Sequence, residues 1–221
     1  MYHTILFDLD GTLTNPGEGI TNSVAYALEK WNIHVEDRTG LYPFIGPPLK
    51  DSFMDFYSFS EEQAEQAVAC YREYFQDRGI FENVVYEGVE EMLKTLKASG
   101  RKIILATSKP EEFAVRILEH FHLAAYFDFI GGASMDGTRV KKADVISYAL
   151  KEGKVTDLSG AVMIGDRKHD ILGAAQAGLD SIGVLYGYGS AEEIASCAPT
   201  HTAATVETLG RLLLSGSATL Q

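Results

Sequence analysis

Cysteine and positive charge are scarce in this sequence. Its 221 residues include two cysteines, Cys70 and Cys197, and no metal-ligand spacing links them. This scarcity argues against a disulfide scaffold and favours a reduced, cytoplasmic setting. Lysine and arginine number 19 against 31 aspartates and glutamates, which gives a formal net charge of -12. So acidic a chain is a poor match for nucleic-acid backbones, and we expect no nucleic-acid partner. If its substrate is anionic, the positive field must be local, from a metal and a few lysines.

Long apolar runs, internal repeats and low-complexity segments are also missing. No run is long and apolar enough to span a bilayer, and the first residues contain no signal-type segment, so we expect no membrane association. With 46% hydrophobic residues, the chain can build one large domain, or a core domain plus a small one. No obligate protein partner is evident.

The most informative stretch is residues 4–14, which read TILFDLDGTLT. A short apolar run that ends at a turn containing glycine is typical of a buried parallel strand, and ligands gather at the carboxyl ends of such strands. Asp8 and Asp10 would both lie there. Two close carboxylates repel each other and need a compensating cation, for which Mg²⁺ is suited by its preference for oxygen ligands. From these residues alone, an ordinary capped turn is the alternative.

The string FDLDGTLT resembles the first motif of the haloacid dehalogenase-like (HAD) hydrolase superfamily, most of whose members are phosphatases. The family pattern is Asp-x-Asp-Gly-Thr/Val after an apolar strand, and Asp8, Asp10, Gly11 and Thr12 match it. The family has three further motifs, each of which finds a counterpart downstream and in order.

The second motif is a strand that ends in threonine or serine. The apolar run 103–106 leads to Thr107, and Pro110 then announces a helix N-terminus, which favours anions. By resemblance, Thr107 hydrogen-bonds the phosphoryl group that is transferred. Ser108 and Lys109 are neighbours with a weaker claim to substrate binding. Taken alone, Thr107 is also typical of a helix cap.

The third motif is a lysine that neutralises the nucleophile and the phosphate. The segment GTRVKKADVISYAL places a basic pair at the head of a helix. By resemblance we choose Lys142, because Lys-Ala-Asp-Val-Ile opens the helix as the family pattern does. Lys141 is the alternative, and spacing cannot separate the two. Either lysine could also be a solvated side chain.

The fourth motif is an acidic pair after another strand. The run 161–164 is followed by Gly165 and Asp166, with Asp170 four residues later, and this resembles the Gly-Asp-x-x-x-Asp form. By resemblance, Asp166 ligates Mg²⁺ directly. Asp170 is then a ligand through water or a partner that orients the lysine, or else an ordinary acid in the first turn of a helix. The implied metal ligands are Asp8, Asp10 through its backbone carbonyl, Asp166 and Asp170.

Residues 15–85 show helical patterns and no convincing alternating strand. Helices are expected over 20–31, from about Leu49 onward, and over 60–78, where Ser60 and Gln63 form a plausible capping box. The prolines between residues 43 and 48 are expected to forbid a helix before Leu49. This stretch matches the small all-helical cap that one large HAD branch carries between its first two motifs. Its FIGPPL loop is a candidate for substrate contact.

From residue 86 onward, apolar runs alternate with helical patterns. Ser190 and Glu193 form a possible second capping box. Such alternation predicts an α/β fold with a doubly wound, mostly parallel sheet, as in the Rossmann-like HAD core. The expected core domain therefore comprises residues 1–14 and 86–221, and the expected cap domain comprises residues 15–85. The expected elements of the core are strands over 103–106, 127–130, 161–164 and 181–185, and helices over 89–99, 142–150 and 205–214.

The resemblance implies a Mg²⁺-dependent phosphatase that acts on a small phosphorylated metabolite. Asp8 would attack phosphorus, while Asp10 would protonate the leaving alcohol and then activate water. The strings TLTNPGEGIT and FIGPPL look most similar to the phosphoglycolate phosphatase-like group, especially its 5'-nucleotidase-like members. The substrate stays open between a nucleoside 5'-monophosphate and 2-phosphoglycolate. A sugar phosphomutase-like phosphotransferase is the alternative enzyme, and a non-catalytic binding domain is a third reading.

Overall fold

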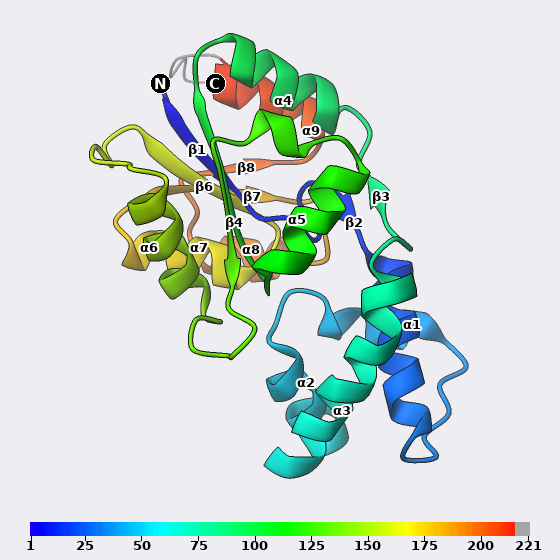
Figure 1. Ribbon diagram of the computed structural model, residues 1–221. Helices are drawn as coiled ribbons and strands as arrows, with labels where there is room; N and C mark the ends of the chain where they lie inside the picture. Colours follow the sequence, from blue (N-terminus) through cyan, green and yellow to red (C-terminus); the bar gives the residue numbers. More distant parts are fainter. Residues whose placement is uncertain (215–221) are drawn as a thin grey trace. The chain divides into compact units, whose positions relative to one another are not determined.

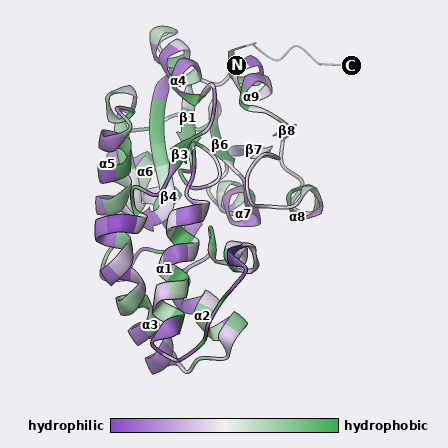
Figure 2. Cartoon of the chain, turned by 90° about the vertical axis from the view of Figure 1, so that its right-hand side faces the viewer, coloured by the Kyte–Doolittle hydropathy of each residue, from purple (hydrophilic) through white to green (hydrophobic). Residues whose placement is uncertain are grey.

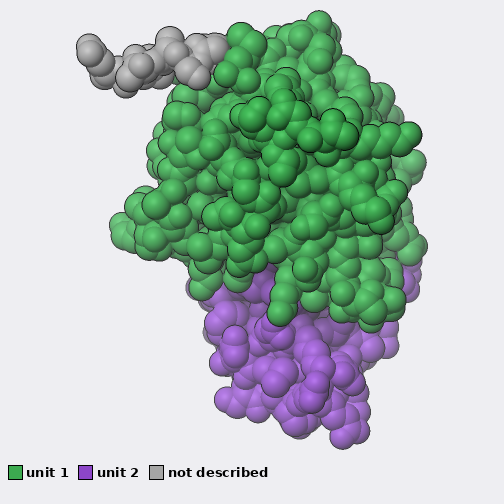
Figure 3. All heavy atoms as spheres, turned by 90° about the vertical axis from the view of Figure 1, so that its left-hand side faces the viewer, with its two compact units in different colours: residues 1–14, 85–221 green, residues 15–84 purple. Residues whose placement is uncertain are grey.

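The computed structural model describes residues 1–214 and forms two compact units. Unit 1 contains Met1–Thr14 and the chain from Val85 onward, and unit 2 is Asn15–Val84 (Figure 3). The second boundary falls one residue before the expected division between residues 85 and 86. The chain passes between the units at strands β2 (Thr14–Asn15) and β3 (Val84–Val85), which pair with each other.

Unit 1 is built on a six-stranded sheet in the order β5-β4-β1-β6-β7-β8 (Figure 1). Every pairing in this sheet is parallel, which confirms the expected doubly wound α/β fold. The last strand was not expected, because three residues at a sheet edge leave too short a pattern to recognise. The strands are β1 (Thr4–Phe7), β4 (Lys102–Pro110), β5 (Phe129–Ala133), β6 (Ala161–Gly165), β7 (Asp180–Val184) and β8 (His201–Ala203).

The strand β1 lies in the middle of the sheet. Phe7 is in register with Leu105 of β4 on one side and with Ile164 of β6 on the other. The backbone N–H of Asp8 donates to the Ile164 carbonyl oxygen at 2.9 Å, so the pairing continues one residue past the strand. The first aspartate therefore emerges at the carboxyl edge, between the ends of two neighbouring strands.

Helices cover both faces of this sheet. One face packs Leu6, Ile104 and Met163 against α6 and α7, and Figure 1 shows α4, α5 and α9 on the opposite side. In Figure 2 the strands are largely hydrophobic in colour, whereas the helices carry both colours, as expected for elements with one buried face. The helices of unit 1 are α4 (Val89–Ala98), α5 (Glu111–His120), the 3₁₀ turn η3 (Ala124–Tyr126), α6 (Lys142–Glu152), α7 (Lys168–Gln176), α8 (Ala191–Ser196) and α9 (Val206–Leu214).

Unit 2 is made of helical elements around aromatic rings. The ring centroids of Phe44 and Phe53 lie 5.0 Å apart, and Phe53 stacks on Phe59 at 5.9 Å. Large rings let so small a unit bury enough apolar area. Its elements are α1 (Gly17–Glu29), the 3₁₀ helix η1 (Arg38–Phe44), α2 (Leu49–Tyr57), α3 (Glu61–Tyr74) and the π turn η2 (Phe75–Gly79).

Two local expectations for unit 2 meet the structure differently. The capping box is confirmed, because the Gln63 N–H donates to Ser60 Oγ and the Gln63 side chain accepts from the Ser60 N–H. The expectation that the proline-containing segment just before Leu49 forms no helix is wrong, because η1 runs through Pro43. A short 3₁₀ helix of this kind tolerates a proline that would break a longer α-helix.

Candidate active site

Three carboxylates meet at the carboxyl edge of the sheet. Asp8 follows β1, Asp166 follows β6, and Asp170 lies in the first turn of α7. Their exposed fractions are 5%, 1% and 1%. One carboxylate oxygen of each lies within 4.8 Å of the others. Such burial of like charges is costly unless cations compensate it, so the cluster marks a site rather than a surface turn.

Glycines let the backbone approach these carboxylates. Gly11 has φ +79°, and a Cβ there would lie 2.1 Å from Asp166 Oδ2. A Cβ at Gly187 would lie 2.3 Å from Asp166 Cβ, and a Cβ at Gly165 would lie 2.0 Å from Asp170 Cγ. Two physical reasons therefore favour glycine at position 11 of the first motif: the left-handed backbone conformation and the close approach of Asp166.

Lys142 lies inside the carboxylate cluster. Its Nζ is 2.8 Å from Asp8 Oδ1 and 2.8 Å from Asp170 Oδ1, and it donates to the Ala106 carbonyl oxygen at 3.1 Å. It is the first residue of α6 and is buried, whereas Lys141 precedes that helix and is exposed. Of the two lysines that spacing could not separate, the structure brings Lys142 to the carboxylates.

Asp10 is not a member of the three-carboxylate cluster and pairs with a second lysine. Its Oδ2 is 2.8 Å from Lys109 Nζ, and the side chains are 11% and 6% exposed. Burial raises the pKa of Asp10, and the Lys109 ammonium acts against that rise. The sequence offered Lys109 only as a neighbour of Thr107, because spacing along a strand end does not show which side chains turn inward.

Thr107 and Ser108 continue the strand that was expected to end at residue 106. Strand β4 runs on to Pro110 with a register shift after Ala106, where it pairs with β5. Thr107 is 1% exposed, and its Oγ1 accepts a hydrogen bond from the Lys109 N–H at 3.2 Å. Ser108 is half-buried. Thr107 is therefore adjacent to both site lysines. It follows Ala106, whose carbonyl oxygen accepts from Lys142, and its own hydroxyl accepts from the Lys109 N–H.

The pKa values of this site follow from burial and charge. Burial raises the pKa of Asp166 well above its usual range, with further contributions from Asp170 and Asp8. Burial also raises the pKa of Asp170, to about 6, against the opposing effect of Lys142. For Lys142 burial alone would lower the pKa, but Asp170 and Asp8 outweigh it and the pKa is raised. Lys142 is therefore always positively charged, but the positive charge around the carboxylates is too small to compensate for their burial.

A divalent cation would correct this imbalance. Four carboxylates face two ammonium groups, so two negative charges are left over. Asp166 Oδ2 accepts from the Tyr188 N–H at 2.7 Å, whereas Asp166 Oδ1 is buried and accepts no hydrogen bond from residues 1–214. An oxygen-only cluster with an unsatisfied carboxylate oxygen fits Mg²⁺. Asp8, Asp166 and Asp170 would hold the ion.

Glu193 has a different role from the one expected. The Ser190 side chain caps α8 as predicted, accepting from the Glu193 N–H at 3.1 Å. The Glu193 carboxylate, however, accepts from Arg167 Nε at 3.0 Å and from the Lys168 N–H at 2.9 Å. This ion pair links α8 to the start of α7, next to Asp166, so the acid stabilises the site loop instead of its own helix.

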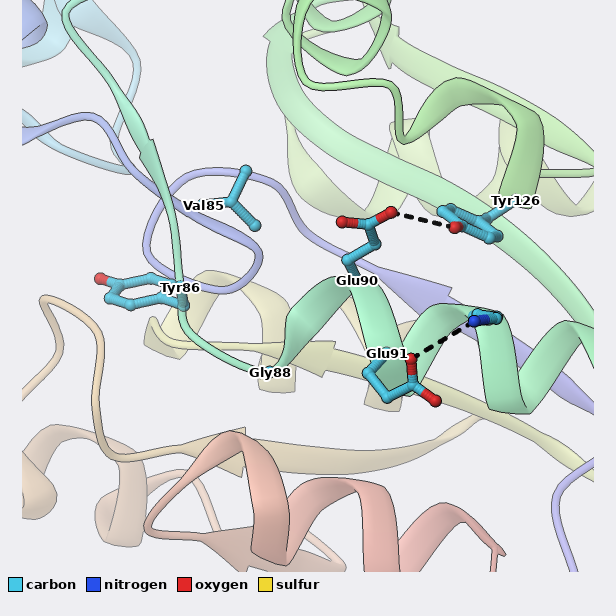
Figure 4. A pocket seen from close by; sticks show the side chains of 7 residues that line it. Val85, Tyr86, Gly88, Glu90, Glu91 and Tyr126 are labelled. Atoms are coloured by element: carbon cyan, nitrogen blue, oxygen red, sulfur yellow. Dashed lines mark hydrogen bonds and ion pairs between the residues drawn. The ribbon is translucent and has the colours of Figure 1, made fainter.

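A cavity of about 530 Å³ lies elsewhere in unit 1 (Figure 4). Tyr126 donates a hydrogen bond to Glu90 at 3.3 Å, and Glu91 lies 3.7 Å from Lys94. None of the buried acids or lysines of the site lines this cavity, so it has no part in the chemistry proposed below. Its lining residues are Val85, Tyr86, Gly88, Glu90, Glu91, Lys94 and Tyr126.

Comparison with known proteins identifies the family. The model of the haloacid dehalogenase-like hydrolase family matches residues 5–184, and the chain belongs to this family. A 5'-nucleotidase from Pseudomonas aeruginosa is 46% identical over 213 residues, which cover 96% of each chain. The crystal structure of a predicted phosphatase from Clostridium acetobutylicum superimposes with a TM-score of 0.94 at 49% identity, over 97% of this chain and 99% of that one.

A third relative carries a different kind of name. The tyrosine-protein kinase PtkA of Mycobacterium tuberculosis is 37% identical over 212 residues, which cover 95% of this chain and 72% of that one. Taken together, the comparisons confirm the expected superfamily and the expected class of enzyme, a phosphatase of the HAD type. No helix within residues 1–214 is both long and apolar enough to cross a membrane.

Proposed function

We propose that this chain is a Mg²⁺-dependent phosphatase that hydrolyses a small phosphate monoester through an aspartyl-phosphate on Asp8. The observation that carries the proposal is that Asp8 and Asp10 pair with different lysines. Asp8 lies with Lys142, Asp166 and Asp170, whereas Asp10 lies beside Lys109. Asp8 thus contacts a lysine ammonium within the carboxylate cluster, whereas Asp10 has a lysine of its own and is available for proton transfer.

In the first step, a carboxylate oxygen of Asp8 forms a bond to phosphorus while the ester P–O bond breaks. Asp10 gives its proton to the leaving oxygen, so that an alcohol departs. Thr107 and the backbone amides after Asp8 hold the phosphoryl oxygens, and Lys142 offsets their charge. A bound Mg²⁺ would supply further charge neutralisation of the phosphoryl group.

In the second step, water attacks phosphorus and passes a proton to the Asp10 carboxylate. The bond between phosphorus and the Asp8 oxygen breaks, and inorganic phosphate leaves. Asp8 is again a carboxylate and Asp10 again an acid, so the cycle closes.

For the substrate, we propose a nucleoside 5'-monophosphate first and 2-phosphoglycolate second. The name of the 46% identical relative, 5'-nucleotidase, supports the first. A phosphoglycolate phosphatase from Colwellia psychrerythraea at 30% identity supports the second.

A phosphotransferase is the second candidate. It would use the same first step and then pass the phosphoryl group from Asp8 to a sugar hydroxyl instead of water. The name of the PtkA relative favours a transfer reaction in the wider family, although its stated acceptor is a tyrosine. A sugar acceptor that lowers phosphate release without lowering substrate consumption would identify the transferase.

The test is phosphate release from a panel of monoesters, with Mg²⁺ and with chelator. The panel contains nucleoside 5'-monophosphates, 2-phosphoglycolate and hexose phosphates. We expect release only with Mg²⁺ and with one clear preference. Asp8→Asn should abolish turnover while its circular dichroism spectrum stays that of the parent, because the amide cannot attack phosphorus. Near-normal release by this variant would refute the mechanism.

A further inference from the structure

Asp10 and Lys109 form a second charged pair, in addition to the cluster of Asp8, Asp166, Asp170 and Lys142. Both side chains are buried, and their charged atoms are 2.8 Å apart. Lys142 and the other carboxylates make a separate set of ion pairs. A buried lysine is costly to retain, so its contact with an acid that is proposed to move protons calls for a functional reason.

The two oxygens of Asp10 are not equivalent. Lys109 is paired with Oδ2, whereas Oδ1 is buried and accepts no hydrogen bond from residues 1–214. A carboxyl group that is tied through one oxygen cannot rotate freely about χ2. The contact with Lys109 therefore fixes where the other oxygen, and any proton on it, is directed.

The backbone of β4 explains how Lys109 reaches this position. Ala106 pairs with Gly131, but Pro110 pairs with Ala133, so four residues of β4 span two of β5. The Lys109 N–H donates to Thr107 Oγ1 at 3.2 Å, which holds the irregular segment together. One bulge thus carries the hydroxyl proposed to bind the phosphoryl group and the ammonium that binds Asp10.

We propose that Lys109 is a positioning residue, which holds Asp10 Oδ2 so that Oδ1 is directed at the leaving oxygen of the substrate. This inference rests on the proposed function, in which Asp10 is the general acid. It adds a residue outside the four motifs and assigns it to one half of the reaction, the departure of the alcohol.

The proposal predicts that the effect of removing Lys109 depends on the leaving group of the substrate. An alkyl leaving group needs a proton as its bond to phosphorus breaks, whereas 4-nitrophenolate is a stable anion and needs almost none. Misplacing Asp10 should therefore slow the cleavage of alkyl phosphates and spare 4-nitrophenyl phosphate. A general loss of folding or of phosphate binding would slow both alike.

The experiment compares kcat/KM for 4-nitrophenyl phosphate, phenyl phosphate and a nucleoside 5'-monophosphate. Because kcat/KM reports the steps up to release of the alcohol, it isolates the role of Asp10 as an acid. For Lys109→Met we expect a loss of about 100-fold with the nucleotide and less than about 10-fold with 4-nitrophenyl phosphate, as general acid catalysis contributes roughly 100- to 10,000-fold. Phenyl phosphate should fall in between.

Two further variants separate positioning from other roles. Asp10→Asn should show the same dependence on the leaving group, and adding Lys109→Met to it should cost little more, because the lysine acts through the acid. Lys102→Met is the matched control, since Lys102 begins the same strand and donates to the Gly153 carbonyl oxygen instead. It should behave as the parent. If Lys109→Met does not fold, Lys109→Gln keeps a donor and should show the same trend more weakly.

Three outcomes overturn the inference. An equal loss with all three esters would mean that Lys109 binds the phosphate or supports the fold. Losses that multiply in the double variant would mean that it acts independently of Asp10. Parent activity in Lys109→Met would mean that it has no role in the reaction. The proposed function fails by a different result, which is activity retained in Asp8→Asn, so the two failures are distinguishable.

Discussion

The two units of this chain stabilise themselves in different ways. Unit 1 buries charge, with Asp8, Asp166 and Asp170 facing Lys142, and Asp10 facing Lys109, at the edge of a sheet of aliphatic side chains. Within residues 15–84, all of which the structure describes, no charged side chain is buried. The interior of unit 2 is held by ring contacts such as that of Phe53 with Phe59.

This difference separates chemistry from packing. Buried charges are useful only where rigid elements hold them within a fraction of an ångström, and a parallel sheet with helices on both faces provides that rigidity. A core of aromatic rings has no such charges to position, so its sequence can vary more freely while its volume is kept. Unit 1 therefore contains every side chain in the proposed reaction.

The largest effect is expected from removing Lys142, the lysine of the carboxylate cluster. Lys142→Met leaves Asp8 and Asp170 buried without their cation, which should cost about 3–5 kcal/mol of unfolding free energy. Phosphate release should fall about 100- to 1,000-fold, because a group aimed at the transition-state charge is lost. Urea denaturation and initial rates measure the two effects. The matched control is Lys141→Met, whose exposed side chain should change stability by less than about 0.5 kcal/mol. Equal effects of the two substitutions would contradict the assignment.

A core substitution in unit 2 is expected to lower the free energy of unfolding by a similar amount without lowering Mg²⁺ affinity. Phe53→Ala removes a fully buried ring and should cost about 3–5 kcal/mol. Trp31, the single tryptophan of the chain, lies 5.0 Å from Phe59 between ring centroids, so its fluorescence reports the unfolding of this unit. Mg²⁺ affinity measured by calorimetry should stay within a factor of about 3, since all the proposed ligands belong to unit 1 and Phe53 packs among the rings of unit 2. Phe56→Ala, at a ring that is 50% exposed, is the milder control. A large drop in Mg²⁺ affinity would show that the units are energetically coupled.

A smaller effect on the free energy of unfolding is expected when Mg²⁺ and pH are varied together. Asp170, whose pKa is raised from 3.8 to about 6, favours its protonated form in the folded state. Its contribution to stability is therefore present below pH 3.8 and lost as the pH rises through about 6. Mg²⁺ binds the ionised form. At pH 7.5 it should therefore stabilise the protein by about 2.7 kcal/mol at a concentration of 100 times Kd, and the same concentration should stabilise it less at pH 5.

Thermal unfolding with Mg²⁺ and with chelator at both pH values checks this expectation. Asp166→Asn serves as the control, because it removes the carboxylate whose Oδ1 is unsatisfied, and its shift with Mg²⁺ should be much smaller. An identical shift at both pH values would mean that the ion binds elsewhere.

Most of the fold could be predicted from local patterns. The central strands are short apolar runs that end in acidic or glycine-containing turns, and such runs are recognisable one by one. The helix α5 begins at the expected acidic pair and α8 at the expected Ser190 cap, and in unit 2 the Ser60 capping box is a four-residue signal. The strand β8 could not be found, because a three-residue edge strand depends on its neighbour β7 more than on its own sequence.

The site was predictable only as far as the motifs reach. Asp8, Asp166 and Lys142 meet because three strand or helix ends lie at one sheet edge, which follows from topology. The pairing of Lys109 with Asp10 depends on a bulge in β4, and the sequence carries no clear signal for that bulge beyond Pro110. The predicted role of Glu193 was wrong because sequence spacing indicates only its local partner, Ser190. In the structure its carboxylate pairs with Arg167, which is distant in the sequence.

The position of β1 in the sheet has a consequence for biosynthesis. Unit 2 is a continuous stretch and is complete once Val84 has been made, whereas β1 gains β4 only after Pro110 and β6 only after Gly165. Since long-range pairings form late and domains fold as units during synthesis, unit 2 can fold while β1 still waits for its neighbours. The proposed nucleophile, Asp8, is among the first residues to leave the ribosome, whereas Asp166, its proposed partner in binding the metal, emerges much later. A nascent chain therefore carries no phosphatase activity until three quarters of its length has been synthesised, about residue 166 of 221.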